Sequence, residues 1–324
     1  MQAIWYERNG TAQDVLVMGE MPTPTPGPGE VLVRVHASGV NPSDCKTRAG
    51  SRPMTAPRVI PHSDGAGVIE AVGGGVDAAR VGTRVWLWNA QWKRPFGTAA
   101  ECIALPAAQA VPLPDNTSFA QGACLGIPAL TALRALLTDG GVAGQTVLVA
   151  GGAGAVGHYA VQFAKRLGAR QVITTVSSAA KATHAGADHA IDYCEEDVAA
   201  RVRELTGGRG VDRVVEVDLA ANASLLPRII RQDGLCVTYG SGAAEMMLGF
   251  GPMVMSGAAI RFFIVYEMLA AARAETEAVL HRFLTAGGVH HAIAAEMPLA
   301  DCAAAQELVM GGKAMGNVVL NVAG

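Results

Sequence analysis

The sequence of 324 residues predicts an α/β fold in which a doubly wound parallel sheet follows a β-rich segment. Three observations predict it. Up to about residue 120, short apolar runs alternate with Pro- and Gly-rich turns. From about residue 121, apolar strands alternate with helical segments, as in successive βαβ units. A glycine-rich turn at 152–157 joins a buried strand to a helix.

The β-rich segment is expected to begin with a strand within residues 1–10. This stretch carries Glu7 and Arg8 and lacks the apolar core of a secretion signal. Further strands are expected at 31–35, 67–72, 84–87 and 99–104. The Pro-rich stretch 22–29 and the glycines 73–75 would supply turns between these strands.

The later part of the chain supplies the parallel sheet. Strands are expected at 147–150, 171–175, 189–191, 211–217 and 235–239, and helices at 155–168, 179–185, 196–205 and 222–232. A further apolar strand at 259–265 would close the sheet, followed by a helix at 267–286 and a strand at 317–322. Ligands of such a sheet bind at the carboxyl ends of its strands.

Composition and charge exclude several classes of protein. Hydrophobic residues make up 50% of the chain and charged residues 16%, as in a compact globular protein. The net charge is −3 and the basic residues are scattered, which argues against a nucleic-acid interface. No apolar run approaches the roughly 18 residues of a membrane span. The six cysteines are widely separated, which indicates free thiols and a cytoplasmic location.

The glycine turn predicts a bound dinucleotide. Gly152 would allow the tight turn from strand to helix, Gly154 the approach of a pyrophosphate, and Gly157 the close packing of helix on strand. With the intervening Ala153, Ala155 and Val156, these residues form the expected phosphate cradle. The free N–H groups and the positive end of the helix dipole would hold the phosphates.

The end of the second strand favours NADPH over NADH. A sheet that prefers NAD carries Asp or Glu about 20 residues after the first glycine, on the ribose 2′-hydroxyl. The segment 172–178 has no carboxylate there and continues with Ser177, Ser178 and Lys181, which can donate to a 2′-phosphate. Tyr193, at the end of the next strand, could cover the adenine or donate to the phosphate. Lys181 could instead be an ordinary solvated helix residue.

Short motifs surround this turn along the whole chain, namely 28–35 (PGEVLVRV), 39–44 (GVNPSD), 64–73 (DGAGVIEAVG), 82–85 (GTRV), 126–136, 186–193 and 239–242. In order and spacing they resemble the quinone oxidoreductase (zeta-crystallin-like) branch of the medium-chain dehydrogenase/reductase superfamily. The resemblance implies a Rossmann dinucleotide-binding domain over 122–262. It also implies a β-rich, GroES-like catalytic domain that is discontinuous, from 1–121 and 263–324. Further cofactor contacts are then expected from Asn222, Gly240, Ser241, Phe263, Ile264 and Val265.

The resemblance also bears on metal binding, because the superfamily contains zinc-dependent and zinc-free members. The zinc-dependent members place a Cys at position 41, a His-Glu pair at 63–64 and a second Cys near 127, whereas this chain has Asn41, Ser63-Asp64 and Ile127. Catalytic zinc needs three ligands from Cys, His and Asp or Glu. The neighbouring His62 and Cys124 are displaced from the pattern and are interpreted as structural. No metal is therefore expected.

Three residues are expected to act in catalysis. Similar reductases place an Asn beside the nicotinamide and the substrate, and Asn41 matches it, although an Asn-Pro turn is the alternative. Thr131 corresponds to a threonine of the family that faces the nicotinamide. The alternative is that its hydroxyl bonds only to the backbone of its own helix. Lys46 stands where such members often have Tyr, which suggests an anionic or oxygen-rich substrate. The aromatic residues Trp88, Trp92 and Phe96 line a substrate pocket or pack under a loop.

The sequence therefore predicts an NADPH-dependent quinone oxidoreductase that transfers hydride without zinc. Reduction of the C=C bond of an alkenal, enone or enoyl thioester is the alternative enzymatic function. A non-catalytic role, as in the lens proteins of this family, fits less well with an intact cofactor turn. A homodimer is expected to form through residues 258–265, because this run is too apolar for an exposed edge strand. The alternative is that the run is a central strand within one subunit.

Overall fold

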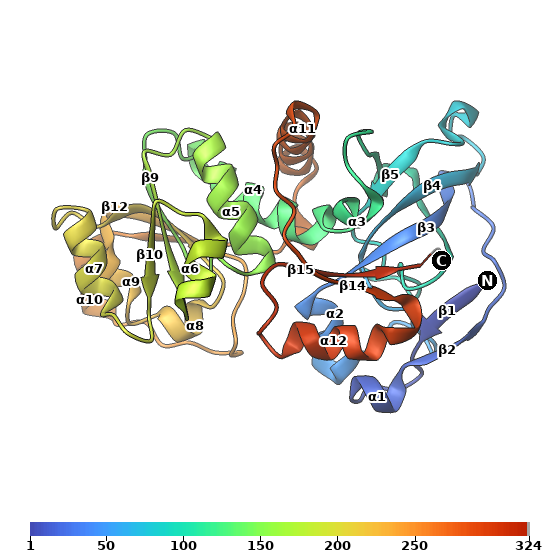
Figure 1. Ribbon diagram of the computed structural model, residues 1–324, viewed down its shortest axis with the longest axis horizontal. Coiled ribbons are helices and arrows are strands. Elements are labelled where there is room, and N and C mark those ends of the chain that lie inside the picture. The colour runs from blue at the N-terminus through green and yellow to red at the C-terminus, as the bar shows by residue number, and fades with distance from the viewer. Residues whose placement is uncertain (323–324) are drawn as a thin grey trace. The chain divides into compact units, whose positions relative to one another are not determined.

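The computed structural model describes residues 1–322 and contains two compact units (Figure 1). The first comprises residues 1–128 together with the described residues from 281 onward, and the second comprises 129–280. The sequence places the boundaries after 121 and after 262. The chain passes between the two compact units within Leu125–Ala129 (η4) and within Ala270–Ala286 (α11).

The first unit is built on a mostly antiparallel seven-stranded sheet. Its order is β14-β15-β3-β4-β5-β7, with β6 also paired to β3. The strands are Glu30–Val40 (β3), Asp64–Val72 (β4), Arg84–Leu87 (β5), Cys102–Pro106 (β6), Ala110–Pro112 (β7), Ile293–Pro298 (β14) and Asn317–Asn321 (β15). Gln2–Trp5 (β1) and Val17–Glu20 (β2) form a separate antiparallel pair. This sheet confirms the β-rich, GroES-like part of the prediction.

Short helices close the first unit around its sheet. They are Ala12–Val15 (α1), Pro42–Lys46 (α2), Phe119–Gly122 (α3) and Cys302–Met310 (α12), with a π-helical turn at Thr47–Ser51 (η1) and 3₁₀ turns at Ala78–Arg80 (η2), Ala107–Gln109 (η3) and Leu299–Asp301 (η7). Val33, Ile69, Ile103 and Leu320 meet in one buried core, together with residues of α12. Burial of these apolar side chains holds β3, β4, β6 and β15 in one layer.

The second unit is a parallel six-stranded sheet with the order β10-β9-β8-β11-β12-β13. Its strands are Thr146–Val149 (β8), Gln171–Val176 (β9), His189–Asp192 (β10), Val211–Glu216 (β11), Ile230–Thr238 (β12) and Ala259–Phe262 (β13). β8 and β11 are buried along their whole length, as parallel strands covered on both faces must be. Numbered within the unit, the strand order is 3-2-1-4-5-6, that of a Rossmann sheet with its switch point between β8 and β11.

Helices cover both faces of this sheet. They are Leu130–Leu137 (α4), Ala155–Arg166 (α5), Ala179–Ala185 (α6), Val198–Leu205 (α7), Leu219–Asn222 (α8), Leu226–Ile229 (α9) and Phe250–Ser256 (α10), with 3₁₀ turns at Thr138–Gly140 (η5) and Val265–Glu267 (η6). α5 packs on β8 and β9 and against α4, whereas α7, α9 and α10 pack together near β10 and β12. In Figure 1 these two groups lie on opposite sides of the sheet.

One expected helix is wrong. The segment 222–232 does not form a single helix, because α8 ends at Asn222, α9 covers only 226–229, and β12 begins at Ile230. Pro227 lies at the start of α9, where a missing N–H costs nothing, but it cannot continue a helix from α8. The helix expected at 267–286 begins later, at Ala270, after η6.

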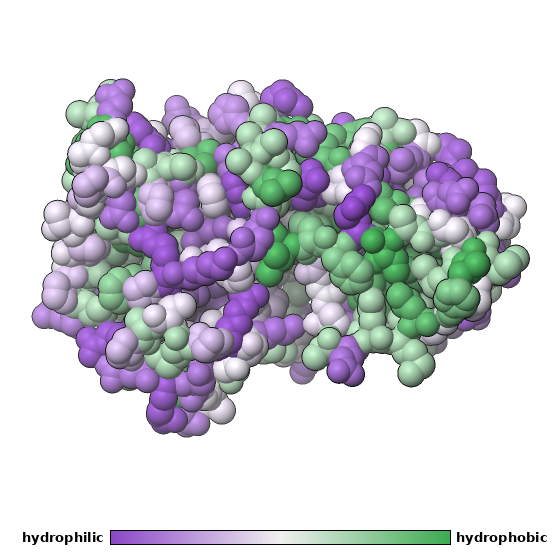
Figure 2. Space-filling model, turned by 180° about the vertical axis from the view of Figure 1, so that it is seen from behind, coloured by the Kyte–Doolittle hydropathy of each residue, from purple (hydrophilic) through white to green (hydrophobic). Residues whose placement is uncertain are grey.

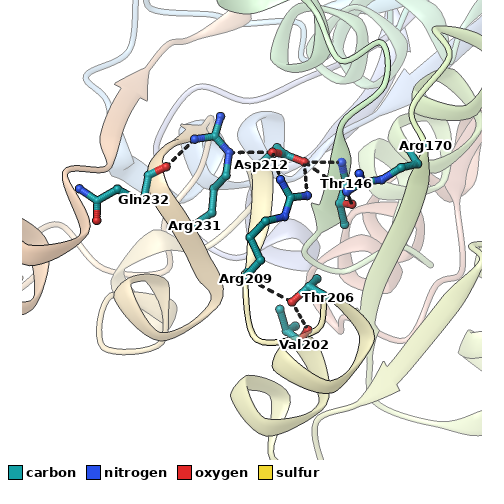
Figure 3. A network of polar contacts seen from close by, with 9 residues as sticks. Thr146, Arg170, Val202, Thr206, Arg209, Asp212, Arg231 and Gln232 are labelled. Atoms are coloured by element: carbon teal, nitrogen blue, oxygen red, sulfur yellow. Dashed lines mark hydrogen bonds and ion pairs between the residues drawn. The ribbon is translucent and has the colours of Figure 1, made fainter.

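A polar network ties together the amino ends of three strands of the second unit (Figure 3). The Asp212 carboxylate of β11 accepts hydrogen bonds from the backbone N–H of Thr146 at 2.7 Å and from Arg231 Nε at 2.6 Å. Arg209 adds two longer contacts at 3.3 Å. Burial raises the pKa of Asp212, but these hydrogen bonds and the nearby arginines outweigh it and leave the pKa below its usual value. The network stabilises the edge of the sheet opposite the glycine turn.

Candidate functional site

The glycine turn leads from β8 into α5 at the carboxyl edge of the second unit's sheet. Gly151 takes a left-handed conformation with φ of 69°, and its N–H donates to Thr175 Oγ1 at 3.2 Å. Gly152 N–H donates to the backbone oxygen of Thr175. Gly154 is the N-cap of α5, which has no side-chain cap at that end. The first N–H groups of α5 are therefore available for an anion.

The three predicted glycines are required for different reasons. A Cβ on Gly152 would lie 2.1 Å from Thr174 Oγ1, and one on Gly157 would lie 2.1 Å from the carbonyl oxygen of Gly151. A Cβ on Gly154 would meet only the Gly151 oxygen, at 3.4 Å. The left-handed turn is made by Gly151, which the sequence analysis did not single out, and Gly152 provides room for the next strand. Gly154 is the least crowded of the three, so the backbone is open on its Cβ side.

The structure brings together the residues predicted to hold a 2′-phosphate. Lys181 Nζ donates to Ser177 Oγ at 3.0 Å, directly after the end of β9. Ser178 is the N-cap of α6 and accepts the N–H of Lys181 at 3.3 Å. Tyr193 follows β10, is 55% exposed, and is held by its N–H to the Val176 oxygen at 3.0 Å. Hydroxyl and ammonium groups meet here without a carboxylate from 172–178, so the segment can accommodate a phosphate.

The remaining predicted cofactor residues lie at or just beyond the carboxyl ends of β11, β12 and β13. Gly240 must be glycine, because a Cβ there would lie 2.5 Å from the Val217 oxygen. Ser241 Oγ donates to the Ala243 oxygen at 2.8 Å. The Phe263 ring lies beside Tyr239, with ring centroids 6.3 Å apart. Ile264 is 38% exposed, whereas Val265 is buried.

Glu216 is a residue of this edge that sequence reasoning missed. The Asn222 amide, predicted to contact the cofactor, donates to both Glu216 carboxylate oxygens at 3.0 and 3.1 Å. The N–H of Asp218 donates to Glu216 at 2.7 Å, and Asp218 in turn accepts the N–H of Gly242 at 2.8 Å. These bonds join the loops after β11 and β12. The sequence signal was a glutamate at the carboxyl end of a strand, directly after Val214 and Val215.

In the first unit, Asn41 lies between two buried carboxyl groups. It is 4% exposed and precedes α2. Its Nδ2 donates to Asp64 Oδ2 at 3.0 Å, and its backbone N–H donates to Asp44 Oδ2 at 2.9 Å. The same Asp64 oxygen accepts the N–H of Ile127 at 2.9 Å. Asp64 was not predicted to bond Asn41, because only the fold brings α2, β4 and η4 together, whereas Asp44 is the third residue of a local capping box that begins at Asn41.

Burial shifts the acid–base properties of this cluster. It raises the pKa of Asp44 to about 7, against hydrogen bonds from Asn41 and the Ser63 N–H that lower it. The pKa of Asp64 is raised well above its usual value, first by burial and second by the nearby Asp44. Both groups therefore bind a proton more tightly in the folded protein than a solvated carboxyl group does.

We expect the free energy of unfolding to fall as the pH rises from about 4 to about 7. Asp44 binds its proton more tightly in the folded state than in the unfolded state, so its contribution is present at low pH and is lost as pH rises through about 7. Denaturant unfolding of wild type and Asp44→Asn across this range would measure it. The free energy of unfolding of Asp44→Asn should fall less with rising pH than that of wild type. Identical pH dependence in both proteins would contradict the raised pKa of Asp44.

The other two predicted catalytic residues lie in different units. Lys46 ends α2 and is exposed, in the same unit as Asn41. Thr131 is 3% exposed in the first turn of α4, in the second unit.

The three aromatic side chains do not share one pocket. Phe96 borders a cavity of about 220 Å³ together with Met1, Met21 and Ile103. The Trp92 ring instead lies 4.3 Å from the Arg52 guanidinium carbon, and Trp88 is half-buried. Neither tryptophan lines that cavity.

The residues at the positions of the zinc ligands do not suit zinc. Asn41 and Ile127 point N–H groups at Asp64, and a metal ligand must offer a lone pair. His62 is fully buried and contacts Ser38 Oγ at 3.0 Å and Gln306 Nε2 at 3.1 Å, and burial lowers its pKa to about 3. Cys124 Sγ donates to the Ala120 oxygen. Residues 1–322 contain no group of three His, Cys, Asp or Glu side chains placed to hold a metal ion.

Two further observations concern the whole described chain. All six cysteines are free thiols, and Cys194 is the exposed one among them. Within residues 1–322, every helix is too short or too polar to cross a membrane.

Comparisons with known proteins agree with this architecture. Residues 27–115 match the family model of the alcohol dehydrogenase GroES-like domain, and residues 155–285 match that of the zinc-binding dehydrogenases. A 2-haloacrylate reductase of a Burkholderia species is 32% identical, over 99% of this chain and 98% of its own. A quinone oxidoreductase of Pongo abelii is 30% identical, over 99% and 97%. The crystal structure of Escherichia coli quinone oxidoreductase in complex with NADPH superposes with a TM-score of 0.88 at 26% identity, over 99% and 100%.

Proposed function

The chain belongs to the zinc-free quinone oxidoreductase group of the medium-chain dehydrogenase/reductase superfamily, and we propose that it is an NADPH-dependent quinone oxidoreductase. One observation carries the cofactor assignment. Beside the glycine turn at 151–157, Ser177 and Lys181 meet just after the end of the neighbouring strand β9, and no carboxylate from 172–178 lies there. The NADPH-bound Escherichia coli enzyme and the quinone oxidoreductase relatives support the same assignment.

The residues that would hold NADPH belong to the second unit. The N–H groups at the start of α5 would bind the pyrophosphate, and Lys181 with Ser177 would bind the 2′-phosphate. The loops joined through Glu216 and Asp218 would border the nicotinamide half. When bound, NADPH supplies a hydride, and a quinone suits such a donor because the charge that develops is delocalised onto its oxygens.

Steady-state oxidation of NADPH against a panel of quinones, enones, enoyl thioesters and unsaturated carboxylates tests the proposal. A quinone should give the highest kcat/KM. Absence of turnover with any quinone, in a protein that binds NADPH, would overturn the quinone assignment.

Reduction of a C=C bond beside a carboxylate is the second candidate. The 2-haloacrylate reductase covers 99% of this chain, and an anionic substrate would be attracted by the exposed Lys46 of α2. In the same panel, a 2-haloacrylate turned over faster than any quinone would favour this candidate. Lys46→Ala should then raise KM for the carboxylate about tenfold and leave KM for a neutral quinone unchanged.

We expect activity without zinc. The groups at positions 41, 63 and 127 are an amide, a hydroxyl and an aliphatic side chain, which do not form a zinc site. Elemental analysis of the purified enzyme should find far less than one zinc per chain, and a chelator should leave kcat unchanged. One equivalent of zinc together with chelator-sensitive turnover would contradict this expectation.

A homodimer through β13 is part of the proposal. β13 is an edge strand of the second unit's sheet and pairs with β12 on one side. Phe262 on β13 is 62% exposed. In the segment that precedes β13, Met247 and, on α10, Phe250 and Met255 are 77–90% exposed. Figure 2 shows hydrophobic side chains gathered over the unit that carries β13. An apolar open edge recruits another strand, and a two-fold axis closes such pairing into a dimer.

Phe262→Asp should weaken the dimer about 100-fold, because it places a charge at the centre of the paired strands. Phe262 is a better site than Phe263, whose ring contacts Tyr239 within the same unit. Sedimentation equilibrium measures the effect, with Met18→Asp as a matched control on β2, where Met18 is 45% exposed. A wild-type monomer of 33.3 kDa at micromolar concentration would exclude the dimer.

A further inference from the structure

Asp64 is the point at which Asn41 and Ile127 meet in the first unit. Here both donate to one oxygen, Asp64 Oδ2, from Asn41 Nδ2 at 3.0 Å and from the Ile127 N–H at 2.9 Å. The carboxyl group of Asp64 connects β4 to η4 and to Asn41 at the start of α2.

The surroundings of Asp64 do not suit a negative charge. The residue is fully buried, and among the described residues its Oδ1 has no hydrogen-bond partner. A Cβ on Gly126 would lie 2.4 Å from this oxygen and 2.6 Å from the carbonyl oxygen of Leu87, so backbone closes this side of the group. No Lys or Arg is among the groups that shift the Asp64 pKa, and the charged neighbour that does so is another acid, Asp44. An ionised carboxylate in such a place would be strongly penalised.

We propose that Asp64 is the positioning residue of this site, a neutral carboxylic acid that orients the Asn41 amide through Oδ2 and carries its proton on Oδ1. Because Oδ2 accepts two N–H groups, it serves as the carbonyl oxygen of the acid, and the proton belongs on Oδ1. The burial of Asp64 and the nearby Asp44 keep the proton bound, since both raise the Asp64 pKa.

Orientation of Asn41 has a direct consequence for catalysis. One Nδ2 proton of Asn41 is donated to Asp64. This hydrogen bond fixes the plane of the Asn41 amide, and with it the direction of the amide oxygen and of the second Nδ2 proton. A fixed amide is prepared to bond to the reacting partners without reorganisation. This inference rests on the proposed function, in which Asn41 contacts the nicotinamide or the substrate.

The first experiment is infrared spectroscopy of the free enzyme at about pH 8, above the pKa of Asp44 of about 7. The difference between wild type and Asp64→Asn should contain the carbonyl-stretch band of a protonated carboxylic acid. A carboxylate band in its place would overturn the proposal. This measurement needs neither cofactor nor substrate, so its outcome is separate from the success or failure of the proposed function.

The second experiment compares turnover of Asp64→Asn and Asp64→Ala. Asparagine can place its carbonyl oxygen at Oδ2 and its amide nitrogen at Oδ1, so kcat should stay within about threefold of wild type. Alanine leaves two N–H groups without an acceptor, so kcat should fall about 30-fold or more while the Kd for NADPH stays within about twofold. A merely structural role would lower both variants together and change the Kd.

Three results would overturn the proposal. They are an Asn variant as impaired as the Ala variant, an Ala variant with wild-type kcat, and one equivalent of zinc bound through an ionised Asp64. If Asp64→Ala fails to fold, the Asn variant and the infrared difference still decide. If wild type turns over no acceptor, the infrared result alone tests Asp64.

Discussion

Gly157→Ala will lower the free energy of unfolding by about 1–3 kcal/mol and abolish NADPH binding. The added Cβ would lie 2.1 Å from the Gly151 oxygen and 2.9 Å from the Gly152 Cα, both of them backbone atoms of the turn. Neither can move without shifting α5 away from β8. The cradle for the pyrophosphate would then be lost together with the packing of helix on strand.

Gly154→Ala is the matched comparison, and it should behave differently. Its Cβ would make one ordinary van der Waals contact, with the Gly151 oxygen at 3.4 Å, and φ of −77° suits alanine. Stability should therefore stay within about 1 kcal/mol of wild type, while NADPH affinity falls at least about tenfold because the pyrophosphate can no longer approach the backbone. Denaturant unfolding and fluorescence titration would measure the two quantities. Unchanged affinity in Gly154→Ala would show that the pyrophosphate does not approach the backbone at Gly154.

Most of the fold could be predicted because local pattern and tertiary environment agree. The strand at 84–87 and the helix at 179–185 occur as expected, β8 is shifted by one residue at both ends, and β9 is one residue longer than predicted. The helix at 222–232 failed because a short apolar run with helical spacing also suits a loop followed by a buried strand. The bend after Asn222 and the left-handed Asp233, with φ of 54°, depend on how β12 packs beside β11.

The site divides in the same way. Gly152, Gly154, Ser177 and Lys181 are close in sequence to the strand ends that position them, so spacing alone was enough to predict which strand ends they follow. Asp64 bonds partners that are distant in sequence, Asn41 and Ile127, and no local pattern distinguishes a buried acid from a solvated one. Asn222 was predicted to contact the cofactor, but no local pattern indicated that its amide donates to Glu216.

Lys181→Ala will weaken NADPH binding at least about tenfold, or about 1.4 kcal/mol, and leave NADH binding nearly unchanged. The ammonium group lies 3.0 Å from Ser177 Oγ at the end of β9, where NAD-binding sheets carry an acid. A charged donor at this place gains most from the two charges of a 2′-phosphate and little from a neutral hydroxyl. Wild type should accordingly bind NADPH at least about tenfold more tightly than NADH.

Fluorescence titration of both cofactors with wild type, Lys181→Ala and Lys165→Ala separates this effect from a general loss of charge. Lys165 lies on α5 and pairs with Asp188 at 2.8 Å, so its removal takes one positive charge from the same unit without touching the strand end. NADPH affinity should fall in Lys181→Ala alone, and the fall should shrink as ionic strength rises, since screening weakens an exposed charge pair. Equal losses for NADPH and NADH in Lys181→Ala would mean that the lysine shapes the turn rather than reads the phosphate. The preference for NADPH would then have to come from Ser177, Ser178 or Tyr193.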